Sequence, residues 1–235
     1  MVVSMPFFFG DYYYFILVLP AVLLAAWAQF KVQSTFKKYS QIGTQSGLSG
    51  EEASRLIQKQ GGISVPVEAT KGSLTDHYDP RVDVIRLSEP VYGARSISAI
   101  GVAAHETGHA MQYATGYGLI KLRSGILPIT QFASTASPYL VLLGFFFSFE
   151  PLLVAGVACF GIAVLFQLLT LPVEFNASAR ALAALDAGGI LNAEELAAAK
   201  KVLWAAAMTY VAALFVSLMS LLRLLLIIGR RRGND

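Results

Sequence analysis

The chain has 235 residues, of which 55% are hydrophobic and only 14% are charged. A water-soluble domain usually carries about a quarter charged residues, so much of this surface is expected to face a lipid bilayer. The formal net charge of +3 is too small to indicate nucleic-acid binding, and the basic residues form no patch interleaved with aromatic side chains.

Four apolar stretches approach or exceed the ~20 residues that a helix needs to cross a ~30 Å hydrocarbon core. No Lys or Arg precedes the first stretch, which favours a retained anchor over a signal peptide. The second and third meet at Glu150-Pro151, which predicts a helical hairpin with a tight turn at 148–151. The four predicted spans are residues 12–30, 124–149, 151–173 and 202–228, the last of them uncharged as far as Leu222.

The basic residues near the ends of these spans predict the orientation of the chain, because Lys and Arg favour the cytoplasmic side. In a four-span arrangement the larger basic set shares its side with the polar segment 40–120, which is therefore expected in the cytoplasm of a bacterium, beneath the inner membrane. Only the cluster at 230–232 falls on the other side, and it contradicts this orientation. Either the last helix does not cross fully, or the earlier spans dominate the orientation. The larger set is Lys31, Lys37, Lys38, Lys121, Arg123, Arg180, Lys200 and Lys201.

The polar segment has the pattern of a small α+β insertion. Ser49 can cap a helix that ends near Gly61-Gly62, and Ser96 can cap a second helix over about 97–115. Three β-prone runs lie between the two helices and predict a small sheet or hairpin. These runs are residues 63–67, 73–78 and 82–87.

After the third span, residues 174–185 predict an Ala-rich continuation of the same helix, which Gly188-Gly189 ends. Asn192 then caps the helix that leads into the fourth span through the connector 174–201. The fold class expected is a mainly α integral membrane protein with about four transmembrane helices, organised as one domain over residues 1–235.

The pentad His105-Glu106-Thr107-Gly108-His109 lies in the helix predicted over 97–115. Residues four apart share one helix face, so His105 and His109 can present their imidazoles to one metal ion. Glu106 can then act as the general base that takes a proton from an activated water. Two of the chain's three histidines stand at this spacing with a glutamate between them, which favours zinc over two ordinary helix residues.

A catalytic zinc site generally has three protein ligands and one open position. The third ligand is either His77 or a carboxylate, and Glu174 is the strongest carboxylate because it ends an uncharged span, where a lone acid is costly. The alternative for Glu174 is a simple interfacial residue paired with Arg180.

Four runs of the sequence resemble the YugP-like bacterial membrane zinc metallopeptidases, and the similarity covers most of the chain. They begin at Gly72 (GSLTDHYDP), Ile85 (IRLS), Ala99 (AIGVAAHETGH) and Leu171 (LPVEFNAS). The resemblance implies a zinc-dependent membrane peptidase.

The run Glu174-Phe175-Asn176-Ala177 is more distantly similar to the HtpX and CAAX prenyl protease group. That resemblance implies that Glu174 is the third zinc ligand. The group commonly has an aspartate four residues after this glutamate, where this chain has Ser178. A hydroxyl can still form a hydrogen bond with a ligand histidine, but it raises the basicity of the ligand less than a carboxylate does.

His77 and Arg180 are further candidates for the catalytic site. In gluzincin-type proteases an edge strand near the zinc helix pairs with extended substrate, and a neighbouring His or Tyr can stabilise the oxyanion. The alternative for His77 is a packing or turn role. Arg180 either assists the transition state or neutralises Glu174.

The function expected is a zinc-dependent membrane endopeptidase of gluzincin type, with one Zn²⁺ per chain and a protein or peptide substrate. His105, His109 and Glu174 would bind the metal. The alternative is a non-catalytic membrane scaffold with a structural metal, although such a site needs four ligands and the chain has few His and Cys. The third possibility, a transporter, would show inverted repeats or broken helices with polar residues at mid-span.

Overall fold

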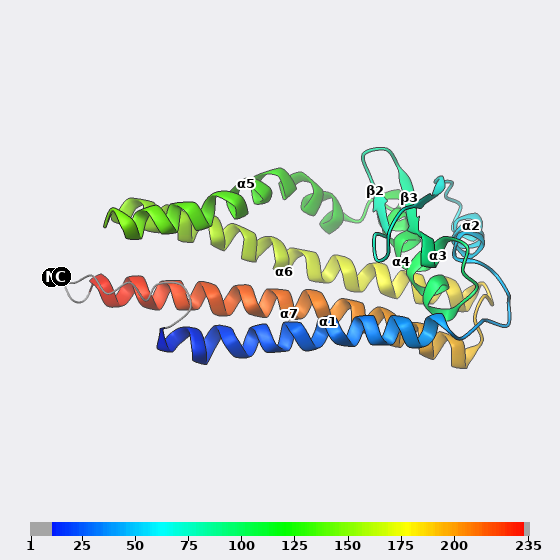
Figure 1. Cartoon of the computed structure of the whole chain (residues 1–235). Helices are drawn as coiled ribbons and strands as arrows, with labels where there is room; N and C mark the ends of the chain where they lie inside the picture. The colour runs from blue at the N-terminus through cyan, green and yellow to red at the C-terminus, as the bar shows by residue number, and fades with distance from the viewer. Residues whose placement is uncertain (1–10, 233–235) are drawn as a thin grey trace. The chain divides into compact units, whose positions relative to one another are not determined.

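The computed structural model describes residues 11–232, and most of them are helical (Figure 1). The elements in chain order are η1 (Tyr14–Val18), α1 (Leu19–Ser40), α2 (Gly50–Gln60), β1 (Val67–Thr70), β2 (His77–Asp79), β3 (Val84–Ser88), α3 (Glu89–Tyr92), α4 (Ile97–Ala114), α5 (Gly118–Phe146), α6 (Glu150–Ala187) and α7 (Ala193–Arg232).

Four helical stretches in the described part of the chain are long and apolar enough to cross a membrane. They are Tyr14–Ser40, Gly118–Phe146, Glu150–Ala187 and Ala193–Arg230. The predicted fold class, a mainly α membrane protein with four spans and a small sheet, is confirmed. Three of the helices extend well beyond the predicted spans, because they continue through polar residues past the charge-free runs.

The chain divides into two compact units, each assembled from separate parts of the sequence. The first, which we call the hairpin unit, comprises the described residues up to Gln29, residues 123–170 and those from Thr209 onward. The second, the helix–sheet unit, comprises residues 30–122 and 171–208. The organisation of the chain as a single domain stays a prediction.

In the hairpin unit, α5 and α6 are joined by the predicted tight turn. Ser148 adopts the left-handed conformation there, with φ of 52°. The two helices pack closely, since a β-carbon on Gly156 would lie 2.6 Å from Cγ2 of Val141. The Ser137 hydroxyl also donates to the carbonyl of Gly156 at 2.8 Å, so the hairpin is held by packing and by a polar contact.

In the hairpin unit, α7 carries one charged residue, Arg223, within its apolar span. The guanidinium of Arg223 is paired with the carboxylate of Asp11, to which its Nε donates at 3.0 Å. Asp11 also accepts from the backbone N–H of Tyr14 at 2.9 Å. A charge within an apolar span is costly unless it is paired, and this ion pair removes much of that cost.

The helix–sheet unit contains a three-stranded sheet in the order β1-β3-β2. β1 is parallel to β3, and β2 is antiparallel to it with His77 opposite Arg86. β2 is therefore an edge strand. The carboxylate of Asp79 binds Arg81 and Arg86, which fixes the end of β2, and the guanidinium and backbone N–H of Arg81 hold the Asp79 pKa well below its usual range.

The strands begin later than the sequence predicts, for local reasons. The backbone N–H groups of Ile63 and Val65 are bonded to Gln58 at the end of α2, which keeps this segment out of the sheet. Leu74 and Asp83 adopt left-handed conformations, with φ of 60° and 53°, and so interrupt the other two runs. The predicted helix starts are confirmed, because the caps at Ser49, Ser96 and Asn192 all form.

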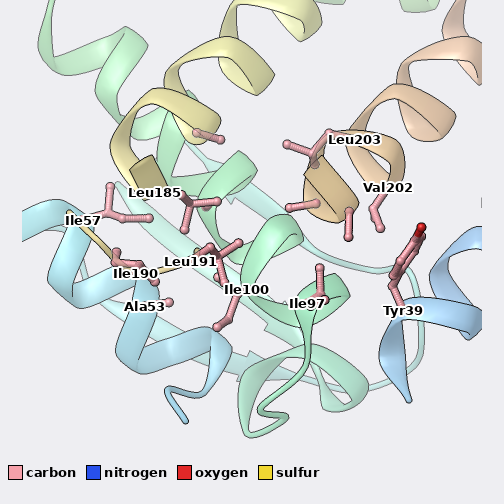
Figure 2. Packing of buried hydrophobic residues seen from close by; sticks show 14 residues of the cluster. Tyr39, Ala53, Ile57, Ile97, Ile100, Leu185, Ile190, Leu191, Val202 and Leu203 are labelled. Carbon is pink, nitrogen blue, oxygen red and sulfur yellow. The ribbon is translucent and has the colours of Figure 1, made fainter. Parts of the chain in front are cut away.

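Helix α4 is buried between two hydrophobic clusters, and most of its residues are inaccessible to solvent. On one side Ala99 and Ala103 pack against the sheet and α3. On the other side Ile100 belongs to a cluster with Ile57 of α2 and Leu185 of α6, and Figure 2 shows these side chains around a common interior. Packing against the two clusters fixes both the position of α4 and its rotation about its own axis.

The α4 and α6 backbones approach each other closely at Gly108. A β-carbon at this position would lie 2.5 Å from the carbonyl oxygen of Ala177 and 3.3 Å from its Cα. These are backbone atoms, so they cannot rotate away as a side chain could. Glycine is therefore required here by space.

We expect Gly108→Ala to destabilise the protein by about 1–3 kcal/mol, because the added methyl group forces the two helices apart. Thermal unfolding of the full chain in detergent measures this as a lower Tm. Gly93→Ala is the control, because Gly93 has φ of −96° and a β-carbon added there would meet no atom within 4 Å. Equal Tm values for the two variants would show that the close approach is not needed.

Candidate metal centre

The two histidines of the pentad lie one turn apart on α4, on the side that faces α6. Their rings are 4.8 Å apart between centroids. The helix begins at the cap formed by the Ser96 hydroxyl, which accepts the N–H of Ala99 at 3.3 Å. His109 is buried and His105 is partly buried, so both imidazoles are sheltered from bulk water.

Glu174 reaches the histidine pair from α6. It is only 3% exposed, and its Oε2 lies 3.3 Å from Nε2 of His105 and 3.6 Å from Nε2 of His109. One ligand atom from each of the three residues lies within 4.8 Å of the others. In a tetrahedral zinc site with bonds of about 2.0–2.1 Å, the ligands lie about 3.3 Å apart, so this set of donors fits the metal.

Gln112 fixes the orientation of His109. Its Nε2 donates to the carbonyl of Val173 at 2.8 Å, and a carbonyl can only accept, so its Oε1 is the atom that faces His109. That oxygen lies 3.0 Å from Nδ1 of His109. Nδ1 must therefore carry the proton, which leaves the lone pair of Nε2 directed toward Glu174.

Ser178 has the corresponding position beside His105. Its Oγ lies 3.1 Å from Nδ1 of that histidine. The hydrogen bond that the sequence predicts between this hydroxyl and a ligand histidine is therefore present. Both histidines are held through Nδ1, and both turn Nε2 toward the same carboxylate.

Glu106 lies on the neighbouring side of α4 and is 8% exposed. Its Oε2 accepts the backbone N–H of Tyr78 at 3.0 Å, so the edge strand β2 holds the carboxylate in place. Burial opposes protonation of His109, but the carboxylates of Glu174 and Glu106 outweigh it and raise the pKa of His109 above its usual value. The centre thus concentrates negative charge around the imidazoles, as a cation site does.

His77 is not brought into this donor group. Among the described residues, the group that contains the histidine pair is completed by Glu174. His77 is exposed in β2, with its Nδ1 2.8 Å from the carbonyl of Thr75. The carboxylate is thus the alternative that the geometry favours for the third donor.

Tyr78, next to His77, contacts α4. Its ring packs 5.4 Å from that of Tyr113. Its hydroxyl donates to Asp83 at 2.6 Å, and burial together with this carboxylate raises the Tyr78 pKa well above its usual value. The phenol is therefore a neutral hydrogen-bond donor at physiological pH.

Arg180 is one turn beyond Asn176 on α6, to whose Oδ1 its Nε donates at 2.8 Å. The same oxygen accepts from Nε2 of Gln112 at 3.0 Å. The guanidinium also lies 5.9 Å from the centre of the Tyr117 ring. Arg180 thus belongs to a polar chain that leads through Asn176 and Gln112 to His109.

Gln112 and the backbone N–H of Tyr78 are two parts of the centre that were not predicted from the sequence. Gln112 follows His109 by three residues, so it shares a helix face with it, and a wholly buried amide in an apolar helix needs polar partners. That spacing was a usable signal. The bond from Tyr78 to Glu106 has no signal in the sequence, because it depends on how β2 meets α4.

Comparison with known proteins identifies a family of zinc metallopeptidases. A family described as "Putative neutral zinc metallopeptidase" matches residues 14–229. The chain is 50% identical over 220 residues to a protein of Bacillus subtilis (strain 168) named "Putative membrane protease YugP", covering 93% of this chain and 98% of that protein. No solved structure matches. The chain belongs to this family of membrane zinc metallopeptidases.

Proposed function

We propose that the protein is a membrane endopeptidase in which His105, His109 and Glu174 hold one zinc ion and Glu106 is the general base. The observation that carries the proposal is the meeting of two histidines from α4 with one buried carboxylate from α6, within 4.8 Å. Three donors leave a position open for water, as a catalytic site requires, whereas a structural zinc site has four. The scaffold alternative has no such support.

Zinc, when bound, supplies a Lewis acid that polarises the scissile carbonyl and acidifies the attacking water. The carboxylate of Glu106 takes a proton from that water as the new C–O bond forms. It then gives the proton to the leaving amine as the C–N bond breaks, so the carboxylate is regenerated. The hydrogen bond from the Tyr78 N–H keeps Glu106 oriented throughout.

The substrate is proposed to bind as an extended peptide along the outer edge of β2. β2 pairs with β3 on one side only, and its Tyr78 N–H points away from β3, toward Glu106. Main-chain pairing along this edge would place a peptide bond next to the general base. His77 remains a candidate for substrate contact from the exposed side of β2, and Arg180 is proposed to position Asn176 and Gln112.

The proposed location is the bacterial inner membrane, with the helix–sheet unit on the cytoplasmic side. The proposal is supported by the lysines that flank the spans, since positively charged residues favour that side. Protein or peptide substrates would then reach the centre from the cytoplasm or from the membrane surface.

Glu106→Gln is expected to keep the metal and to lose at least about 10²-fold in kcat, because an amide cannot accept the proton. Hydrolysis of an unstructured protein such as casein by the full chain in detergent, together with metal analysis, measures both effects. Glu194→Gln, at an exposed position on α7, is the charge-matched control. Full activity of the Glu106 variant would rule out the proposed mechanism.

Removal of zinc with a chelator is expected to abolish hydrolysis and lower the Tm, and added zinc should restore both. A ligand present at 100-fold over its Kd stabilises the folded state by about 2.7 kcal/mol. In Glu174→Gln, the Tm should change far less than in the wild type when chelator or zinc is added, because the variant lacks the proposed third ligand. If that variant responds like the wild type, Glu174 is not a ligand.

Gln112→Leu and Ser178→Ala are each expected to weaken zinc binding by roughly 10- to 100-fold, because a freed imidazole loses its orientation and basicity. Competition with a fluorescent zinc chelator measures the affinity. Ser40→Ala is the control, since that exposed hydroxyl donates only to the carbonyl of Lys37. Unchanged affinity in both variants would mean that the Nδ1 contacts do not orient the histidines.

A further inference from the structure

A second candidate site lies in the helix–sheet unit, between the end of α1 and the beginning of α7. It is a groove of about 750 Å³, which we call the lysine groove. Its lining includes Lys31, Lys38, Lys200, Lys201, Thr35 and Trp204. None of the lining residues belongs to the metal centre or to its hydrogen-bond partners.

The positive charge of this groove is not neutralised by protein carboxylates. Within residues 11–232, none of its four lysines forms an ion pair. α1 contains no acidic residue. The acids at the start of α7 are Glu194 and Glu195, and the carboxylate of Glu195 accepts the backbone N–H groups of Gln45 and Asn192. Four lysines that line one groove without a carboxylate partner are complementary to an anion.

The anion is identified by the place of the groove along the spans. Lys31 directly follows the uncharged run 12–30, and Lys200 and Lys201 directly precede the uncharged run 202–222. The groove therefore lies where both apolar runs end, at the depth of lipid headgroups. Trp204 is 51% exposed at this edge, and exposed indoles favour the membrane interface.

The mixed lining favours a phospholipid over a free phosphate ion. The lysines and the Thr35 hydroxyl can bind phosphate oxygens, whereas Trp204 and Ala205 add apolar surface that continues into the membrane span. An inorganic ion has no group that could use this apolar surface.

We propose that the lysine groove binds the phosphate headgroup of an anionic phospholipid, with Trp204 against the glycerol and the first acyl carbons. Lys38 from α1 and Lys200 and Lys201 from α7 contact the headgroup from two helices, so one lipid would bridge them. The proposal does not depend on the peptidase activity.

The test uses the full chain in neutral detergent. Of its two tryptophans, Trp27 is replaced in the variant Trp27→Phe, so that Trp204 alone reports the fluorescence. Its fluorescence is titrated with a short-chain phosphatidylglycerol, with phosphatidylcholine of the same chain length, and with inorganic phosphate. We expect a saturable change with phosphatidylglycerol and little change with the other two.

Two triple variants of equal charge separate the groove from general surface attraction. Lys38→Gln/Lys200→Gln/Lys201→Gln should weaken the phosphatidylglycerol response by about tenfold or more. Lys37→Gln/Lys59→Gln/Lys71→Gln, which changes lysines outside the lining, should leave it unchanged. A third variant, Lys38→Arg/Lys200→Arg/Lys201→Arg, should retain binding, which would show that these positions tolerate substitution.

Three outcomes would overturn the proposal. Equal weakening by the two Lys→Gln triples would indicate attraction to the whole basic surface. An equal response to phosphatidylcholine would indicate detergent-like partitioning. Saturation by inorganic phosphate at the same concentrations would assign the groove to a free anion instead of a lipid.

Discussion

At position 108 the α4 and α6 backbones are so close that a single methyl group does not fit between them. The donor set depends on this approach, because the histidines belong to one helix and Glu174 to the other. The two hydrophobic clusters hold α4 on two of its faces, and Gln112 bonds it to the α6 backbone. Packing and hydrogen bonding thus fix the same geometry, and the small residue inside the pentad is part of the centre.

A buried carboxylate is expensive unless its charge is balanced, and Glu174 is almost wholly removed from solvent. Two imidazole nitrogens face it, and in the tautomer that binds a metal they present lone pairs, which supply no compensating charge. A divalent cation between them would supply it, so the fold and the proposed metal stabilise each other. The same reasoning explains why Nδ1 of each histidine has a hydrogen-bond partner. If either ring rotated away, the buried Glu174 carboxylate would lose a polar neighbour.

Much of this arrangement was predictable from local signals. The caps at Ser49, Ser96 and Asn192, the hairpin turn and the histidine spacing all depend on residues close together in the chain, and all are found as expected. The strand starts were not predicted, because a contact from Gln58 and two left-handed residues overrode the β-prone composition. The hydrogen bond from the Tyr78 N–H of β2 to Glu106 joins segments that are distant in the chain, and no periodicity in the sequence predicts such a contact.

α6 is a single helix that runs from the membrane hairpin to Glu174 and beyond. During synthesis the histidines leave the ribosome first, and the proposed third donor follows only after α5 and most of α6 have been made. A chain that stopped short of α6 would carry the pentad without a complete donor set. The order of the elements along the chain would then act as a safeguard, since hydrolytic capacity would appear only after the first three membrane helices had been made.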